Sequence, residues 1–300
     1  MATGLARGVV HEMVLGRVVL VDGRVEDRPG RRLSAGQVVE AVLVVESEAG
    51  PAPDASVEFV VVHEDDWLLV VDKPAGLVVH PGAGTPGSTL VNGLLHRYPE
   101  LAGVGQPGRP GIVHRLDKGT SGLLLVARTP AAYDALTTML AERLVSRRYL
   151  ALVDGVVASD QGLIDAPVGR SARRPTRMAV SAGGREARTS YQVIRRFPAY
   201  GVTLTECALE TGRTHQIRVH LSSIGHPVLG DSQYRRPRRP GAAELPPGAV
   251  PTRPFLHAGA LRLDHPNGTG RLELDSALPR DLARALEVLE RAEAQETAGD

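Results

Sequence analysis

Short apolar runs of β-type residues recur along this chain, and few helical segments separate them. The pattern predicts strands at Phe59–Val62, Leu68–Val71, Gly122–Ala127, Tyr149–Val153, Ala187–Ile194 and Val202–Leu209. A doubly wound parallel sheet needs a crossover helix between consecutive strands, and most of these runs lack one. We therefore expect an α+β fold.

Three helices are predicted around these strands. The first follows Thr129-Pro130, a capping residue with proline in the first turn, and its apolar positions are Tyr133, Leu136, Leu140 and Leu144. A second helix spans Arg213–Ile224, with Ile217, Leu221 and Ile224 on one face, and ends at Gly225. The third begins near Pro279 and is amphipathic through Leu282, Leu286 and Leu289, so it should pack on the domain.

The chain divides by composition into a small first region, a linker and a large domain. Residues 1–48 predict a helix (Leu5–Leu15) and two strands (Val18–Val21 and Val38–Val45), with a turn at Asp22-Gly23. Residues 49–57 are rich in proline and alanine and form a linker, and 58–300 form the main domain. Residues 235–254 hold so much proline, glycine and arginine that we expect a mobile surface loop.

Positive charge is concentrated in the middle of the chain. The 300 residues have a formal net charge of +1, but residues 101–240 contain 21 basic and 10 acidic side chains, a local excess of 11. Such a distribution is typical of a phosphate-binding face between neutral or acidic surfaces. The single cysteine excludes an internal disulfide, and no signal peptide or membrane-spanning run is visible, so a cytoplasmic protein is expected.

The segment GIVHRLDKGTSGLLLVAR, residues 111–128, places Asp117 in a glycine-bracketed turn before an apolar run. An aspartate in such a turn is usually structural. Here Arg115 and Lys118 flank it and favour its charged form, and the following strand would fix the turn rigidly. A carboxylate held between cations can act as a nucleophile or a base, which makes Asp117 a candidate catalytic residue.

A second polar segment, TGRTHQIRVHL at residues 211–221, has basic and amide side chains at spacings that suit a helix facing RNA. These side chains could equally be a solvated helix face. However, Arg218 directly follows the apolar Ile217, so its guanidinium should be partly buried and need an acidic partner, for which Asp117 is the candidate.

Tyr149 begins a predicted strand after Arg147-Arg148, and either a core position or a base-stacking role would explain it. Metal binding is not expected, because His215 and His220 are five residues apart and no other possible ligands lie at a recognised spacing. No nucleotide fingerprint is present, so we expect no cofactor.

Taken together, these motifs resemble the RluA/RluD-type pseudouridine synthases over about residues 58–280. The similarity includes EDDWLLVVDKPAGLVVHP, HRLDKGTSGLLLVAR, SRRYLALVDG, TGRTHQIRVHLSSIGHPVLGD and FLHAGALRLDHP. The resemblance implies a mixed, mainly antiparallel sheet with helices around a cleft. It implies isomerisation of uridine in structured RNA, most simply large-subunit ribosomal RNA, on a nucleotide flipped out of the RNA, by a monomer without metal or cofactor.

The resemblance also assigns roles to individual residues. Asp117 would be the catalytic aspartate, Tyr149 the aromatic residue against the target base, and Arg218 the partner of the aspartate. Arg115 would enter the space that the flipped nucleotide leaves. The remaining residues of the two polar segments that we expect to bind substrate are His114, Arg213, His215 and Gln216.

Residues 1–48 are similar to the second half of a small RNA-binding domain that a ribosomal small-subunit protein shares with these synthases. The opening helix of that domain is missing, so either the start lies farther upstream or the module is reduced. Arg235 stands where the family commonly has glycine. Two alternatives to ribosomal RNA modification remain, namely the same chemistry on tRNA and a non-catalytic RNA-binding factor for ribosome assembly.

Overall fold

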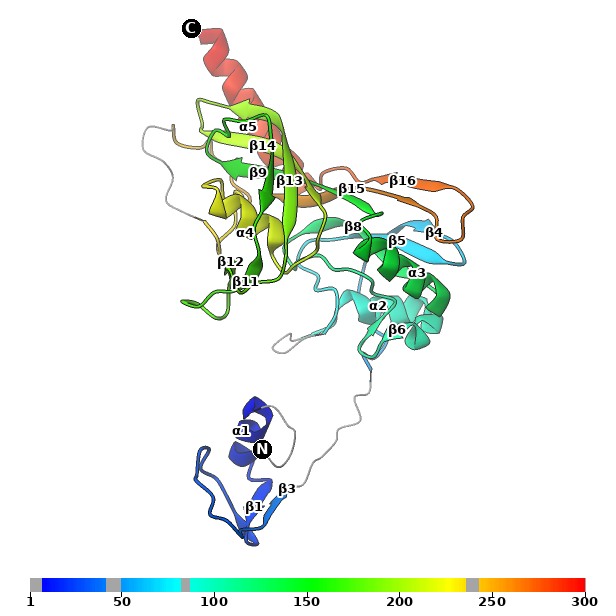
Figure 1. Ribbon diagram of the computed structural model, residues 1–300. Coiled ribbons are helices and arrows are strands. Elements are labelled where there is room, and N and C mark those ends of the chain that lie inside the picture. Colours follow the sequence, from blue (N-terminus) through cyan, green and yellow to red (C-terminus); the bar gives the residue numbers. More distant parts are fainter. Residues whose placement is uncertain (1–6, 42–49, 82–86, 236–242, 300) are drawn as a thin grey trace. The chain divides into compact units, whose positions relative to one another are not determined.

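A computed structural model of the chain describes residues 7–41, 50–81, 87–235 and 243–299 (Figure 1). The chain forms two compact units, residues 1–49 and 50–300. Each unit is described by itself.

The first unit contains one helix and a small antiparallel sheet. Helix α1 is Arg7–Leu15, and strands β1 (Val19–Val21), β2 (Arg24–Val25) and β3 (Val39–Ala41) pair in the order β2-β1-β3. The predicted turn at Asp22-Gly23 is confirmed, since both residues have positive φ, as a tight hairpin requires. Residues 5 and 6, at the start of the predicted helix, and residues 42–45, at the end of the predicted Val38–Val45 strand, lie outside the described residues.

The second unit is built on a nine-stranded sheet in the order β10-β13-β14-β9-β15-β8-β5-β4, with β16 paired to β15 (Figure 1). Only β15 and β8 pair in parallel, and every other described pair in this sheet is antiparallel. The predicted α+β class with a mixed, mainly antiparallel sheet is therefore confirmed. The strands are β4 (Val60–Glu64), β5 (Leu68–Lys73), β8 (Ser121–Ala127), β9 (Ser146–Asp154), β10 (Gln161–Asp165), β13 (Arg188–Phe197), β14 (Val202–Leu209), β15 (Leu256–Asp264) and β16 (Arg271–Asp275).

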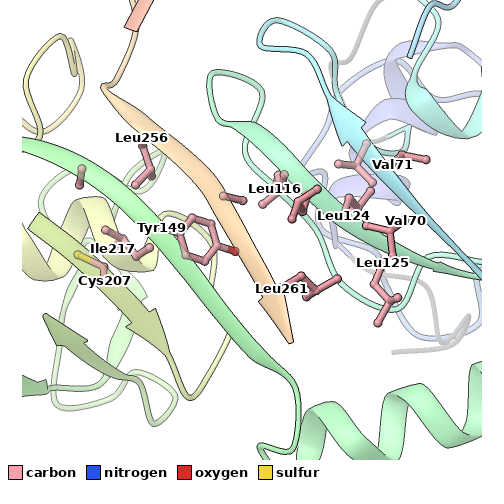
Figure 2. Close-up of a cluster of buried hydrophobic side chains, with 14 of the residues drawn as sticks. Val70, Val71, Leu116, Leu124, Leu125, Tyr149, Cys207, Ile217, Leu256 and Leu261 are labelled. Carbon is pink, nitrogen blue, oxygen red and sulfur yellow. The ribbon is translucent and has the colours of Figure 1, made fainter. Parts of the chain in front are cut away.

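The centre of the sheet is buried on both faces. Every residue of β8 is buried, which explains why its sequence is a continuous apolar run and does not alternate. Gly122 allows the close approach of β8 to β15, because a Cβ there would lie 2.3 Å from the carbonyl oxygen of Ala258. Figure 2 shows the core continuing across these strands, from Val70 and Leu125 to Leu261 and Tyr149.

Helices and short elements cover this sheet. The helices are α2 (Leu90–Arg97), η1 (Pro99–Gly103), α3 (Pro130–Ala141), α4 (Gln216–Ser223) and α5 (Arg280–Gly299). Two small hairpins pair β6 (Gly105–Gln106) with β7 (Arg109–Pro110) and β11 (Val168–Arg170) with β12 (Met178–Val180). Helix α3 contacts β8, and α4 contacts β12 and β13.

The predicted helices are confirmed, but two of their apolar faces end earlier than expected. Thr129 caps α3 by accepting a hydrogen bond from the Ala132 amide, and α3 ends at Ala141, so Leu144 lies beyond it and is exposed. Ile224 follows the end of α4 and is also exposed. Along α5, Leu282 and Leu289 are fully buried, which confirms that this helix packs on the domain.

The predicted linker and the predicted surface loop, both inferred from composition, make specific contacts in the structure. Within the proposed linker, the Asp54 amide donates to the carbonyl of Asn92 in α2, and the Asn92 side chain donates to the carbonyl of Ala52. The prediction that residues 235–254 form a mobile surface loop is wrong for the end of that segment. There Ala249 is fully buried in the hydrophobic core, and Leu245 packs against the same core. Residues 236–242 lie outside the described residues.

Candidate active site

Asp117 lies in the turn between β7 and β8, and both sides of the turn are anchored. The preceding residue, Leu116, is buried in the core (Figure 2). The amide of Thr120 donates to the carbonyl of Asp117, and the amide of Gly76 donates to the carbonyl of Lys118. The Asp117 side chain is 15% exposed, so the carboxylate is largely but not wholly shielded from water.

Arg218 joins this carboxylate to a second one. Its Nη1 donates to Oδ2 of Asp117 over 3.3 Å, while Nε and Nη2 donate to the two carboxylate oxygens of Asp231 over 2.6 and 3.0 Å. Asp117 was expected to be the partner of Arg218, but the closer, two-point partner is Asp231. Burial opposes the charge of Arg218, and the hydrogen bonds and charges of Asp231 and Asp117 outweigh it and raise the pKa of Arg218.

Asp231 was not predicted from the sequence to be a site residue. Its side chain is fully buried, and besides Arg218 it accepts hydrogen bonds from the amides of Gln233 and Tyr234. These contacts form a tight turn after β-bridge residue Val228 and outweigh burial, so the pKa of Asp231 is lowered. Its position two residues after Leu229, at the end of the HPVLGD motif, is a sequence signal that could have identified it.

His215 precedes α4 in a left-handed conformation, with φ of 57°, so the helix begins at Gln216 and not at Arg213 as predicted. Its Nδ1 lies 2.8 Å from the hydroxyl of Tyr234, and its Nε2 lies 3.9 Å from Oδ2 of Asp117. The same hydroxyl accepts a hydrogen bond from the amide of Met178, and the Tyr234 ring faces the guanidinium of Arg218 at 5.0 Å. Tyr234 therefore contacts both His215 and Arg218, whose side-chain nitrogens lie within 4 Å of the Asp117 carboxylate.

Gln216 uses its side chain to hold the turn before α4. Its Oε1 accepts from the hydroxyl of Thr211 and the amide of Arg213, and its Nε2 donates to the carbonyl of Arg188 and the hydroxyl of Thr189. Because these contacts are all within the protein, Gln216 organises the backbone from which Arg213 and His215 extend. The Nε of Arg213 donates to the carbonyl of Glu186.

Tyr149 lies on β9 opposite Cys207 of β14, and only 4% of the residue is exposed. Figure 2 shows its ring between Ile217 of α4 and Leu116 of the aspartate turn. Burial raises the pKa of its hydroxyl. The ring is thus a rigid apolar wall beside the carboxylate, which is what a platform for a planar base requires.

His114 fixes the start of the aspartate turn to β8. Its Nε2 accepts a hydrogen bond from the amide of Leu125, so the neutral ring has its hydrogen on Nδ1. Burial, with a further contribution from the charge of Arg147, lowers the pKa of His114 to about 3. The ring is therefore neutral at physiological pH, and its role in the turn does not depend on charge.

A fully buried lysine that was not predicted from the sequence holds the segment whose Gly76 amide binds the aspartate turn. Lys73 ends β5 and donates from Nζ to the carbonyls of Pro74 and Leu77. Burial lowers its pKa to about 7, although the charge of Asp117 acts in the opposite direction. Lys73 thus places a cation, or a neutral amine near pH 7, behind the aspartate.

Every site residue predicted from the sequence lines one cavity of about 500 Å³. These residues are His114, Arg115, Asp117, Tyr149, Arg213, His215, Gln216 and Arg218. Further arginines in the wall, Arg143, Arg147 and Arg185, add positive charge. The cavity is large enough for a nucleotide, and its wall combines a carboxylate, an aromatic ring and cations. Within the described ranges, no three His, Cys, Asp or Glu side chains are grouped as a metal site would need.

The comparisons with known proteins agree with this geometry. Residues 67–223, which include Asp117, Tyr149 and Arg218, match the sequence model of the RNA pseudouridylate synthase family. The chain belongs to this family. It is therefore an RNA pseudouridine synthase, an isomerase that converts uridine in RNA to pseudouridine.

Several relatives of this synthase are similar over nearly the whole chain. It is 44% identical to "Ribosomal large subunit pseudouridine synthase D" of Xanthomonas campestris, with 95% of this chain and 85% of the relative covered. The protein of the same name from Pseudomonas aeruginosa is 45% identical over 90% of this chain and 83% of its own. An uncharacterized RNA pseudouridine synthase, YlyB of Bacillus subtilis, is 40% identical over 95% of this chain and 90% of its own.

A solved structure supports the fold of the synthase. Human RNA Pseudouridylate Synthase Domain Containing 4 superposes with a TM-score of 0.59 at 27% identity and covers 77% of this chain and 93% of its own. The overall architecture described above is therefore similar to that of this human protein. No helix in the part of the chain that the structure describes is long and apolar enough to cross a lipid bilayer.

Proposed function

We propose that this synthase modifies uridine in large-subunit ribosomal RNA and that Asp117 is its catalytic residue. The single observation that most supports the role of Asp117 is its hydrogen bond to Arg218 at 3.3 Å, within a cavity that Tyr149 also lines. The choice of RNA is supported by the relatives named ribosomal large subunit pseudouridine synthase D, which match over at least 90% of this chain.

The chemistry begins when the target uridine leaves the RNA stack. Flipping costs a few kcal/mol, which stacking on Tyr149 and contacts with the cavity's arginines offset. Arg115, which is exposed at the cavity, enters the space that the nucleotide leaves. The flipped uridine then lies with its ribose next to Asp117 and its base against Tyr149.

The Asp117 carboxylate then either attacks C1′ of the ribose or removes a proton from C2′. In the first case an ester between Asp117 and C1′ forms as the bond between C1′ and N1 breaks, and the ester breaks when C5 bonds to C1′. In the second case loss of the C2′ proton and of N1 leaves a glycal, and the proton returns to C2′ when C5 bonds to C1′. In both cases the uracil turns while it is held in the cavity. The hydrogen lost from C5 is balanced by one gained at N1, so the product is an isomer of the substrate. Arg218, fixed by Asp231, holds the carboxylate in place throughout.

The small first unit is proposed to be a partial RNA-binding module that adds affinity for the substrate. Residues 49–57 would connect it to the catalytic domain, 58–300. A cytoplasmic monomer that acts without metal or cofactor is sufficient for this reaction, because the isomerisation needs no oxidant and no energy source.

Mapping of the product tests this proposal. Total RNA from a strain that lacks the protein is incubated with the purified chain, and pseudouridine is located by carbodiimide treatment and primer extension. New modified positions in large-subunit ribosomal RNA are expected. New pseudouridines in tRNA alone would show that tRNA is the substrate. Binding to RNA without any new pseudouridine would favour a non-catalytic assembly factor.

A further inference from the structure

Arg147 is a buried guanidinium in the wall of the cavity beside Asp117, and it has no counterion among the residues that the structure describes. The residue is 7% exposed, its Nε has no hydrogen-bond partner in the described ranges, and its Nη2 reaches the carbonyl of Leu209 only at 3.5 Å, the outer limit for a hydrogen bond. Among the described residues, no carboxylate lies within 4 Å of it. Arginine does not lose its proton in proteins, so this site is positively charged.

Three other cavity arginines, Arg143, Arg185 and Arg218, differ from Arg147 in this respect. Arg218 binds Asp231 and Asp117, and Arg143 binds Glu186 and Glu210 at 2.7 and 2.8 Å. Arg185 is exposed, so water hydrates it. Arg147 has neither a carboxylate partner among the described residues nor full contact with water. Burying a cation in this way costs several kcal/mol, which an anionic ligand would recover.

Strand geometry places this cation close to the proposed base platform. Arg147 and Tyr149 are both buried and are two residues apart on β9, so their side chains project from the same face at a separation of about 7 Å. That distance is on the scale of one nucleotide. A base against Tyr149 would therefore place one of its flanking phosphates near Arg147.

We propose that Arg147 binds a backbone phosphate that flanks the target uridine. The proposal rests on the proposed function, because it needs a flipped nucleotide in the cavity. A guanidinium suits this ligand, since its planar donors match two phosphate oxygens and a charged hydrogen bond is stronger than a neutral one. Arg147 thereby fixes the register of the RNA and places the correct ribose beside Asp117.

The test is a double-mutant cycle between the protein and the RNA. The probe is the ribosomal RNA fragment that the wild-type protein modifies, with one uncharged methylphosphonate at each flanking phosphate in turn. Affinity is measured with Asp117→Asn, which prevents turnover, with and without Arg147→Met. Arg147→Met alone and the methylphosphonate at the contacted phosphate alone should each weaken binding about tenfold. At that phosphate, the two changes together should weaken binding no more than either change alone.

The exposed neighbour supplies a matched control. Arg148 pairs with Glu206 at 2.6 Å on the surface, so Arg148→Met should combine additively with every methylphosphonate. Arg147→Gln is used in case Arg147→Met does not fold, and it too should lose the dependence on the same phosphate. Additive effects for both Arg147 variants at every flanking phosphate would overturn the assignment.

Turnover separates this proposal from the function on which it rests. If the wild-type protein forms pseudouridine in the unmodified fragment and the cycle is additive, only the phosphate site is wrong. If the wild-type protein forms none in any RNA, the proposed function fails and the phosphate site fails with it.

Discussion

Arg218 and Asp231 form a buried two-point ion pair, with Nε–Oδ2 and Nη2–Oδ1 distances of 2.6 and 3.0 Å, and this pair aims the remaining nitrogen of Arg218 at Asp117. The guanidinium is planar, so two fixed nitrogens determine where the third one points. Asp231 therefore orients the guanidinium that binds Asp117, the proposed catalytic residue, without touching Asp117 itself. We propose that Asp231 acts as a positioning residue.

We predict that Asp231→Asn impairs both stability and activity. The buried charge of Arg218 loses its main partner, so the free energy of unfolding should fall by about 3 kcal/mol, and the misplaced Asp117 should lower kcat at least ~100-fold. Urea unfolding and single-turnover kinetics measure the two effects. Asp160→Asn is the control, since it removes an exposed partner of Arg196 and should change neither quantity appreciably. Normal turnover by Asp231→Asn would contradict the positioning role.

Asp117→Asn should separate chemistry from binding. The substitution removes the reacting carboxylate but leaves Arg218 bound to Asp231, so the fold and the cavity persist. We expect turnover below detection and an RNA dissociation constant within about threefold of the wild-type value, because phosphate contacts dominate affinity. Filter binding and pseudouridine mapping measure both. Asp134→Asn on the exposed face of α3 should behave as wild type, and measurable turnover by Asp117→Asn would assign the chemistry to another residue.

Tyr234→Phe should lower kcat more than it changes KM. The variant keeps the ring over Arg218 but loses the contacts of the hydroxyl with His215 and with the amide of Met178. The contact with His215 holds that side chain next to Asp117. The loss of such contacts should cost about 1–2 kcal/mol in the transition state, or roughly tenfold in kcat. Tyr98→Phe removes a comparable bond to Glu64 away from the cavity and should keep full activity. Equal rates for the two variants would exclude a positioning role for Tyr234.

Stability should fall as the pH drops below about 6.5. His114 has a pKa of about 3 in the folded chain because it is buried, and an ordinary pKa near 6.5 when unfolded. The unfolded chain therefore takes up a proton that the folded chain does not, which destabilises the fold by up to about 1.4 kcal/mol per pH unit between these values. His114→Gln should reduce this slope between pH 6.5 and 4.5. The exposed His96→Gln should leave it unchanged, and an equal slope in both variants would refute the assignment to His114.

Cys207 should resist alkylation in the native protein. It is the only cysteine in the chain, it lies opposite Tyr149 in the sheet, and burial raises its pKa to about 12. Because only the thiolate reacts, iodoacetamide at pH 7.5 should modify the native chain at least ~100-fold more slowly than the urea-unfolded chain. Mass spectrometry counts the single adduct. Rapid native labelling would show that the core beside Tyr149 opens readily.

The sequence by itself determined the fold class and named the candidate site residues, because both are encoded in local patterns. Apolar runs without intervening helices predicted the α+β class, and the family resemblance implied the mixed, mainly antiparallel sheet. The strand at β8 was predicted from its continuous apolar run, which is typical of a strand buried on both faces. The motifs around Asp117, Tyr149 and Arg218 named residues that line a single cavity. Composition alone predicted a mobile surface loop at residues 235–254, but packing against distant parts of the chain buries Ala249.

Only the tertiary structure decided how those residues are paired. Asp231 is 13 residues from Arg218 and Asp117 is 101 residues away, and no local pattern favours the nearer carboxylate. The left-handed His215, the contacts of Tyr234 and the lack of a counterion for Arg147 in the described part of the chain likewise depend on which strands and turns meet at the cavity. Hydrogen bonds and ion pairs act over a few ångströms, so they are set by the packed positions of side chains and not by their spacing along the chain.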